Sequence, residues 1–154
     1  MKSQKGITMV SLVITVIILI ILSSIGITIG TNSISSSNDS KLTSELLMVQ
    51  HAVLEQYTKF QTVKDKGILV GNKMQLTEVQ AIAQELGITL VSIPDNYSNK
   101  DYYRLDKAAL LEIGIKDTND EYIINYVSGE VMNITQKTTS NNNALYVKGN
   151  SFYQ

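Results

Sequence analysis

Residues 7–30 read ITMVSLVITVIILIILSSIGITIG and contain no charged side chain. As an α-helix this segment would extend over about 36 Å, at about 1.5 Å per residue, which is enough to cross the hydrocarbon core of a bilayer. A buried helix of a soluble domain seldom runs so far without a charge. We therefore expect residues 7–30 to form a transmembrane helix.

Charges on either side of this segment predict its orientation. Lys2 and Lys5 precede the apolar run, and no further charged residue occurs before Asp39. Because positively charged flanks stay in the cytoplasm, we expect a single-pass membrane protein whose C-terminal domain lies outside the cytoplasm.

The residues directly before the apolar segment form a distinctive leader. Residues 1–6 read MKSQKG, so a short, basic leader ends in Gly6, and the apolar run begins at once with Ile7. This arrangement resembles the class III prepilin N-terminus of type IV pilin-like and pseudopilin proteins, in particular those of Gram-positive type. The resemblance covers roughly the first 30 residues closely and the rest only in architecture. It implies that a prepilin peptidase cuts between Gly6 and Ile7 and that Ile7 is then N-methylated.

One position departs from the family pattern. Pilins of this family carry a glutamate at the position that Ser11 occupies in this sequence. The family associates that glutamate with methylation of the new N-terminus and with pairing between subunits. Ser11 therefore favours a minor subunit and leaves the methylation of Ile7 open.

Two other interpretations of the N-terminus compete with a prepilin leader. A cleaved secretory signal fits worst, because its apolar core would be shorter and would end in an Ala-x-Ala-like site, whereas no alanine precedes Ala52. A permanent signal anchor requires neither Gly6 nor an amphipathic helix beyond the membrane. The alternative to a pilin is thus a signal-anchored surface protein with a small extracellular binding domain.

Three hydroxyl residues share one face of the apolar helix. Thr8, Ser11 and Thr15 are spaced three and four residues apart. Small hydroxyl side chains allow helices to approach closely and to form hydrogen bonds across the interface, so these residues are a candidate assembly face. The alternative is that each hydroxyl bonds the carbonyl one turn earlier in its own helix.

Helical periodicity resumes beyond the apolar segment. Residues 31–40 are rich in Ser and Asn and form either a linker or a weak stretch of one long helix. Apolar residues then recur every three or four positions up to residue 61, which predicts an amphipathic helix that packs on the following domain. This packing stripe comprises Leu42, Leu46, Val49, Val53, Tyr57 and Phe60. Leu47 and Leu54 lie on another face, where they would contact a neighbouring subunit in a filament and would be partly exposed in a monomer. His51 is expected to face solvent.

Residues 62–154 are expected to form a globular α+β head domain. Residues 76–86 predict a helix, with Thr77 and Gln80 as a capping box and Gly87 as its end. A second helix should begin at Asp106 and end before Gly114.

Strands are expected on both sides of the second helix of the head domain. Residues 88–93 predict a short strand, and residues 95–103 a loop. Residues 122–127 and 130–134 predict an antiparallel hairpin around a two-residue turn, and residues 145–148 a last strand. The fold class is therefore α+β, with a long N-terminal helix packed on a small antiparallel sheet, as in pilins.

The sequence contains no motif that is typical of a catalytic site. Cysteine is absent, His51 is the only histidine, and no phosphate-binding or hydrolase motif occurs, so we expect no catalytic residues, no cofactor and no enzymatic activity. Thirteen basic residues balance 14 acidic ones and are scattered, which gives no nucleic-acid signal. Asp117, Asn119 and Glu121 are a weak candidate for Ca²⁺ binding, and a solvated turn is the preferred interpretation of these residues.

The resemblance also implies a set of partners. These are other pilin or pseudopilin subunits, the prepilin peptidase, a platform membrane protein and an assembly ATPase. Adhesion or twitching pili, DNA-uptake pseudopili and secretion pseudopili all remain open as the machine that this chain would serve. In each case the mature chain would leave the membrane to join a filament at the cell surface.

Overall fold

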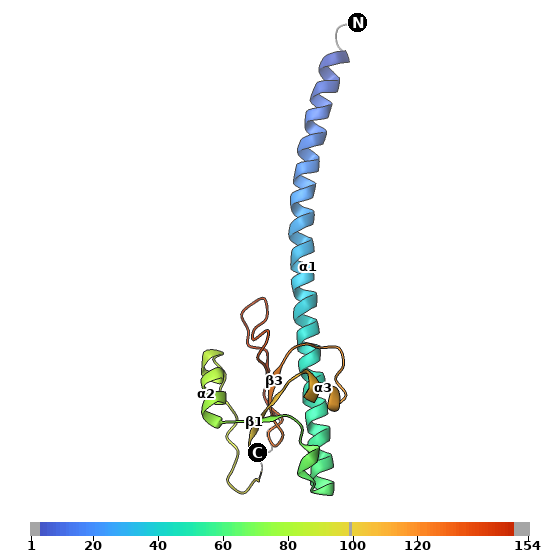
Figure 1. Cartoon of the computed structure of the whole chain (residues 1–154). Coiled ribbons are helices and arrows are strands. Elements are labelled where there is room, and N and C mark those ends of the chain that lie inside the picture. Colours follow the sequence, from blue (N-terminus) through green and yellow to red (C-terminus); the bar gives the residue numbers. More distant parts are fainter. Residues whose placement is uncertain (1–3, 99, 150–154) are drawn as a thin grey trace. The chain divides into compact units, whose positions relative to one another are not determined.

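The computed structural model describes residues 4–98 and 100–149, and for residues 4–10 and 19–36 it describes the backbone but not the side chains. The chain divides into two compact units, Met1–Asn38 and Asp39–Gln154. Helix α1 (Gln4–Val63) supplies residues to both units (Figure 1). Residues 31–40 are helical, so of the two alternatives for this Ser- and Asn-rich stretch the helix is the one observed.

The second unit, Asp39–Gln154, has an antiparallel five-stranded sheet with the strand order β1-β2-β3-β4-β5. The strands are β1 (Asn72–Met74), β2 (Tyr102–Leu105), β3 (Tyr122–Asn125), β4 (Val131–Asn133) and β5 (Tyr146–Val147). The other elements are the short 3-10 helix η1 (Lys66–Ile68) and the helices α2 (Leu76–Glu85) and α3 (Lys107–Glu112). The predicted α+β class, with helices on an antiparallel sheet, is confirmed.

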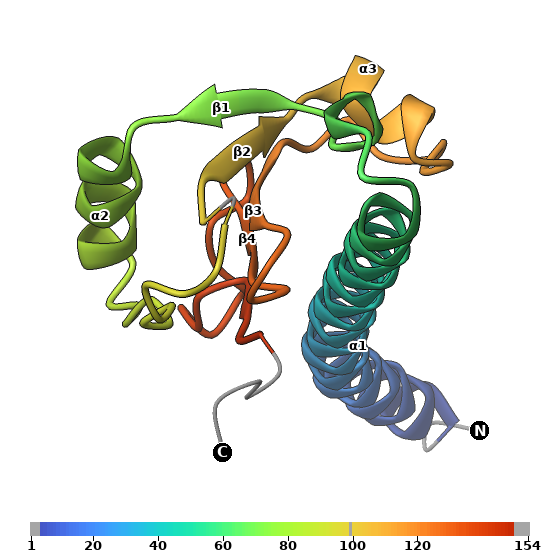
Figure 2. The same cartoon turned by 90° about the horizontal axis from the view of Figure 1, so that it is seen from below.

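Successive side chains of each strand point to opposite faces of the sheet, and the second unit therefore has one hydrophobic cluster on each face. Tyr122 and Ile124 of β3 point to one face of the sheet and join a cluster with residues of α1 and α3. Ile123 points to the other face and packs with Val79 and Ala83 of α2. Figure 2 shows α2 on one side of the sheet and the C-terminal part of α1 with α3 on the other.

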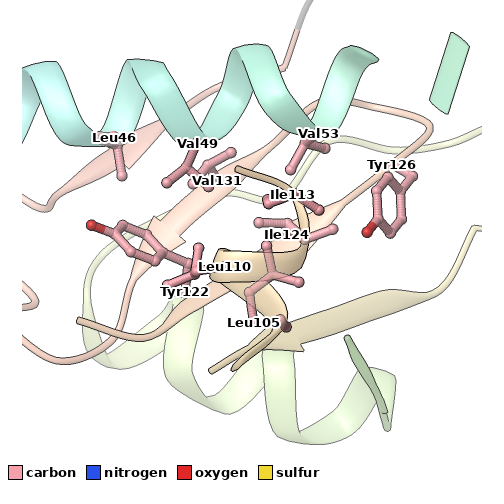
Figure 3. Close-up of a cluster of buried hydrophobic side chains, with 11 residues drawn as sticks. Leu46, Val49, Val53, Leu105, Leu110, Ile113, Tyr122, Ile124, Tyr126 and Val131 are labelled. Carbon is pink, nitrogen blue, oxygen red and sulfur yellow. The ribbon is translucent and has the colours of Figure 1, made fainter. Parts of the chain in front are cut away.

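The packing stripe of α1 enters the larger of these two clusters. Val49 and Val53 are fully buried and Leu46 is 3% exposed, and all three point toward Ile124 and Val131 of the sheet (Figure 3). Of the remaining stripe residues, Phe60 is buried, and Leu42 and Tyr57 are half-buried. On the other faces of α1, Leu47 and His51 are exposed and Leu54 is half-buried.

Both short helices of the second unit end in the same glycine motif. After α2, Gly87 has a φ of 67° and its N–H bonds the Gln84 carbonyl at 3.1 Å, while the Ile88 N–H bonds the Ala83 carbonyl at 2.8 Å. This is the Schellman arrangement, in which glycine accepts the left-handed conformation at no steric cost. Gly114, with a φ of 90°, ends α3 in the same way.

The two helices begin differently. The Asp106 carboxylate caps α3 by accepting a hydrogen bond from the Ala109 N–H at 2.9 Å, as predicted. The predicted capping box of Thr77 and Gln80 is wrong, because α2 begins at Leu76 with Gln75 as a cap that makes no side-chain hydrogen bond. Thr77 therefore lies inside the first turn.

The prediction of a strand at residues 88–93 is wrong. The loop predicted at residues 95–103 is too long at its C-terminal end, because β2 begins at Tyr102. Residues 88–93 pair with no strand among the residues that the structure describes, whereas Tyr102 and Tyr103 belong to β2, between β1 and β3. Local β-propensity is high in residues 88–93, but tertiary packing overrides it because β2 takes the place beside β3.

The predicted hairpin forms with a different register. Ile124 pairs with Val131, so residues 126–129 form the loop instead of residues 128–129 alone. The shift follows from the side chain of Asn125.

Asn125 is fully buried and its side chain organises the start of this loop. Its Oδ1 atom accepts hydrogen bonds from the N–H groups of Val127 and Ser128, both at 2.9 Å. Its Nδ2 atom donates to the Lys100 carbonyl at 2.8 Å. In an Asx turn of this kind the side chain accepts hydrogen bonds from loop N–H groups. In a longer hairpin these groups would bond the carbonyl groups of the opposite strand instead.

Two neighbouring leucines of α1 test the packing of the stripe. Leu46→Ala should lower the free energy of unfolding by about 2–5 kcal/mol, because it leaves a cavity in the core. Leu47→Ala, at a side chain that is 44% exposed, should lower it by less than about 1 kcal/mol. Denaturant unfolding of the full chain in detergent, followed by circular dichroism, measures both. Equal effects of the two substitutions would contradict the packing of α1 described above.

Candidate functional site

The proposed processing site lies in the first unit. Residues 4–6 of the leader, Ile7 and Thr8 have helical backbone in α1, while their side chains, like residues 1–3 altogether, lie outside the described residues. Of the candidate assembly face, Ser11 and Thr15 are described and exposed. The Thr15 hydroxyl donates to the Ser11 carbonyl at 2.7 Å, which is the hydrogen bond within the helix that was the alternative for this residue.

The described side chains of the first unit leave a large apolar surface uncovered. Between residues 12 and 18 the aliphatic side chains are 47% to 65% exposed. They are Leu12, Val13, Ile14, Val16, Ile17 and Ile18. Burying an aliphatic side chain contributes roughly 1.5–3 kcal/mol, so an exposed apolar surface of this extent is typical of a region that contacts a membrane or another protein.

Within the described residues, no helix has a stretch that is both long enough and apolar enough to cross a membrane. The side chains of residues 19–30, in the second half of the predicted span, lie outside the described residues.

Glu130 is a buried carboxylate that holds several segments of the second unit together. It is 2% exposed. Its Oε1 atom accepts hydrogen bonds from the Val91 N–H at 2.8 Å and the Tyr146 hydroxyl at 2.7 Å. Its Oε2 atom accepts hydrogen bonds from the hydroxyls of Tyr102 at 2.8 Å and Ser128 at 2.7 Å. One side chain thus joins the loop after α2, the strands β2 and β5, and the hairpin loop.

The four donors to Glu130 are one backbone N–H and three hydroxyls, and none of them is a cation. Hydrogen bonds from several donors stabilise an ionised carboxylate without a counter-ion. Burial raises the pKa of the Tyr102 and Tyr146 hydroxyls, and the neighbouring Glu130 carboxylate raises it further. Both phenols therefore remain protonated donors at neutral pH, and we interpret the Glu130 cluster as structural.

The hairpin loop beside Glu130 also contacts α1 and the C-terminal segment. The Gln50 side chain of α1 donates to the Gly129 carbonyl at 2.8 Å. A Cβ atom added at Gly149 would lie 1.7 Å from the Ser128 carbonyl oxygen, so only glycine permits this crossing. The sequence reasoning did not identify these contacts.

Two residues of the weak calcium candidate bind other side chains. Glu121 is paired with Arg104, whose Nε atom donates to the carboxylate at 3.0 Å. The Asn119 side chain accepts a hydrogen bond from Lys107 Nζ at 2.8 Å, and Asp117 is exposed. In the described part of the chain, no group of three or more His, Asp or Glu side chains is placed to hold a metal ion.

Sequence reasoning missed Glu130 as the central buried polar residue. A signal was present, because Glu130 is the only charged residue between Glu121 and Lys137. A single acid inside a run of apolar and β-branched residues indicates a buried, hydrogen-bonded carboxylate.

Comparisons of the chain with protein-family models, with curated proteins and with solved structures found no match.

Matched Glu→Gln substitutions test the role of the Glu130 cluster. Glu130→Gln should lower the free energy of unfolding by about 2–4 kcal/mol, because an amide cannot accept all four hydrogen bonds and leaves buried donors unpaired. Glu121→Gln, at a partly exposed ion pair, should cost about 1 kcal/mol or less. Denaturant unfolding gives both values, and a Glu130→Gln variant as stable as Glu121→Gln would refute the role given to the cluster.

Tyrosine ionisation provides a test by pH. Burial raises the pKa of Tyr102, Tyr103, Tyr122, Tyr126 and Tyr146. In an unfolded chain tyrosines ionise near pH 10, roughly. Above that pH the unfolded state holds fewer protons than the folded state, so the free energy of unfolding falls as the pH rises.

We expect these tyrosines to ionise together with unfolding. In an alkaline titration, the rise in tyrosinate absorbance should coincide with the loss of circular dichroism. Ionisation of all tyrosines near the ordinary pKa in a chain that keeps its circular dichroism would show that the phenols are not buried as described.

Proposed function

We propose that this chain is a structural subunit, a pilin or pseudopilin, of a type IV pilus-like or type II secretion-like filament, and that it is not an enzyme. The observation that carries the proposal is the uncovered aliphatic surface of α1 at residues 12–18, within a charge-free run that starts directly after Gly6. A surface of this kind needs an apolar environment on all sides of the helix.

Two environments meet this need in succession. Before assembly the helix of residues 7–30 lies in the membrane with Lys2 and Lys5 on the cytoplasmic side. A prepilin peptidase removes residues 1–6, and a platform protein and an ATPase then move the subunit into a filament. There the apolar helices of neighbouring subunits replace the lipid. The presence of Ser11 favours a minor subunit and leaves the methylation of Ile7 open.

The second unit supports this assignment through the way it uses α1. Leu46, Val49 and Val53 of α1 are part of its hydrophobic core, so the part of α1 that follows Asn38 belongs to the folded unit. A signal anchor, which is the alternative function, could end before Asp39 and be joined by any linker. The proposal therefore explains why the helix continues as far as Val63.

Cysteine cross-linking tests assembly through the apolar helix, because the chain contains no cysteine of its own. Thr15→Cys should give disulfide-linked dimers when cells or filaments are treated with an oxidant, since neighbouring helices pack side by side. Asn96→Cys, in an exposed loop, serves as the control for random collisions and should remain monomeric.

The processing step is tested in the same system. Gly6→Leu, introduced together with Thr15→Cys, should keep residues 1–6 on the chain and abolish dimers in the filament fraction. Monomeric Thr15→Cys in every fraction, at normal expression, would overturn the filament proposal and favour a signal-anchored surface protein.

A further inference from the structure

Residues 88–93 read ITLVSI and have the composition of a strand, yet they pair with no strand of the described chain. The segment runs without a turn or a bend from residue 88 to residue 94. Ile88 and Leu90 pack against the cluster between α2 and the sheet, which fixes the segment in place. It is therefore an ordered, strand-like segment with an open edge.

Hydrogen bonding shows which backbone groups of this segment are open. The Val91 N–H donates to Glu130, so it points toward the sheet. Successive residues of an extended chain direct their N–H and C=O groups to opposite sides. The backbone groups of Leu90 and Ser92 consequently point away from Glu130, and they have no hydrogen-bond partner among the described residues. Ser92 is exposed.

Two neighbouring hollows lie along this segment and α2. The first, of about 380 Å³, is lined by Leu76 and Gln80 of α2 and by residues 90–93, with Lys100 and Tyr102. The second, of about 540 Å³, shares Gln80 and Leu90 with the first and continues to the end of α2. The hollows are of a size that accommodates several side chains.

The charged side chain that lines the first hollow is positive. Lys100 is the only charged residue that lines either hollow, and it is paired with Asp95 at 2.7 Å. The Asp95 side chain is fully exposed, so an acid from a partner can replace it at little cost.

We infer that residues 88–93 are a docking edge for an extended peptide segment of a partner protein. The peptide adds as a strand, pairs its backbone with the free groups of Leu90 and Ser92, places alternate apolar side chains in the hollows, and brings an acidic residue to Lys100. Glu130 acts as a positioning residue, because its bond to the Val91 N–H turns the open edge outward. Backbone pairing supplies affinity, and the hollows with their lysine supply selectivity.

This docking edge lies entirely in the second unit and does not depend on the filament proposed above. Its occupant must be a peptide backbone, because alternating N–H and C=O groups in an extended segment are matched by another extended chain. A like segment from a second copy would carry no acid for Lys100, since residues 86–94 are uncharged.

The test uses the full chain in detergent micelles and a displayed library of random decapeptides. We expect the selected peptides to alternate apolar residues and to contain an acid. Fluorescence anisotropy with a labelled selected peptide should show binding that Ser92→Pro weakens by about tenfold, through loss of an edge N–H. Lys116→Pro, in an exposed loop outside residues 88–93, is the control for the introduction of a proline, and it should bind as the unmodified chain does.

Two further variants separate the contributions to binding. Lys100→Glu should abolish the preference for an acid, and methylation of alternate backbone nitrogens of the peptide should abolish binding. Circular dichroism checks that each variant is folded.

Three results would overturn the inference. They are a selection without enriched peptides, equal binding by the Ser92→Pro and Lys116→Pro variants, and self-association of the full chain that Ser92→Pro removes. The last result would identify a second copy of the chain as the occupant.

Discussion

The burial of one side of α1 in the larger core cluster is the constraint on which the second unit depends. Val49 and Val53 are fully buried against a sheet face that also carries Ile124. A five-stranded sheet with short strands cannot cover that face by itself, and α3 is only six residues long. The helix that bears the apolar N-terminal segment is therefore also the main covering layer of the folded unit.

The opposite face of the sheet is held by a different kind of interaction. There α2 covers the strands, and Glu130 binds four donors from four separate segments. Apolar packing on its own would tolerate small shifts between these segments, whereas hydrogen bonds of fixed length and direction do not. The cluster thus fixes the path of residues 88–93, which would otherwise be free to change their position along α2.

Local signals in the sequence predicted much of this fold, and long-range pairing accounts for the rest. The stripe on α1, the Asp106 cap and the glycine that ends α2 depend only on neighbouring residues, and all are readable from spacing. Residues 88–93 were predicted as a strand from composition, but β2 occupies the place beside β3. Which segment wins a place in a sheet depends on contacts distant in sequence, and so does the burial of Glu130. The assembly residues of the N-terminal segment depend on other molecules and stay predictions.

Entry of the apolar helix into a filament after removal of the leader is the step that we propose and that most needs a test. It is tested most directly by the intact mass, with the N-terminal sequence, of the chain purified from its native membrane. We expect a chain that begins at Ile7, with or without a methyl group. A chain that still begins at Met1 would contradict this proposal and indicate a signal anchor, and a start near Ile27 would contradict it in favour of ordinary secretion.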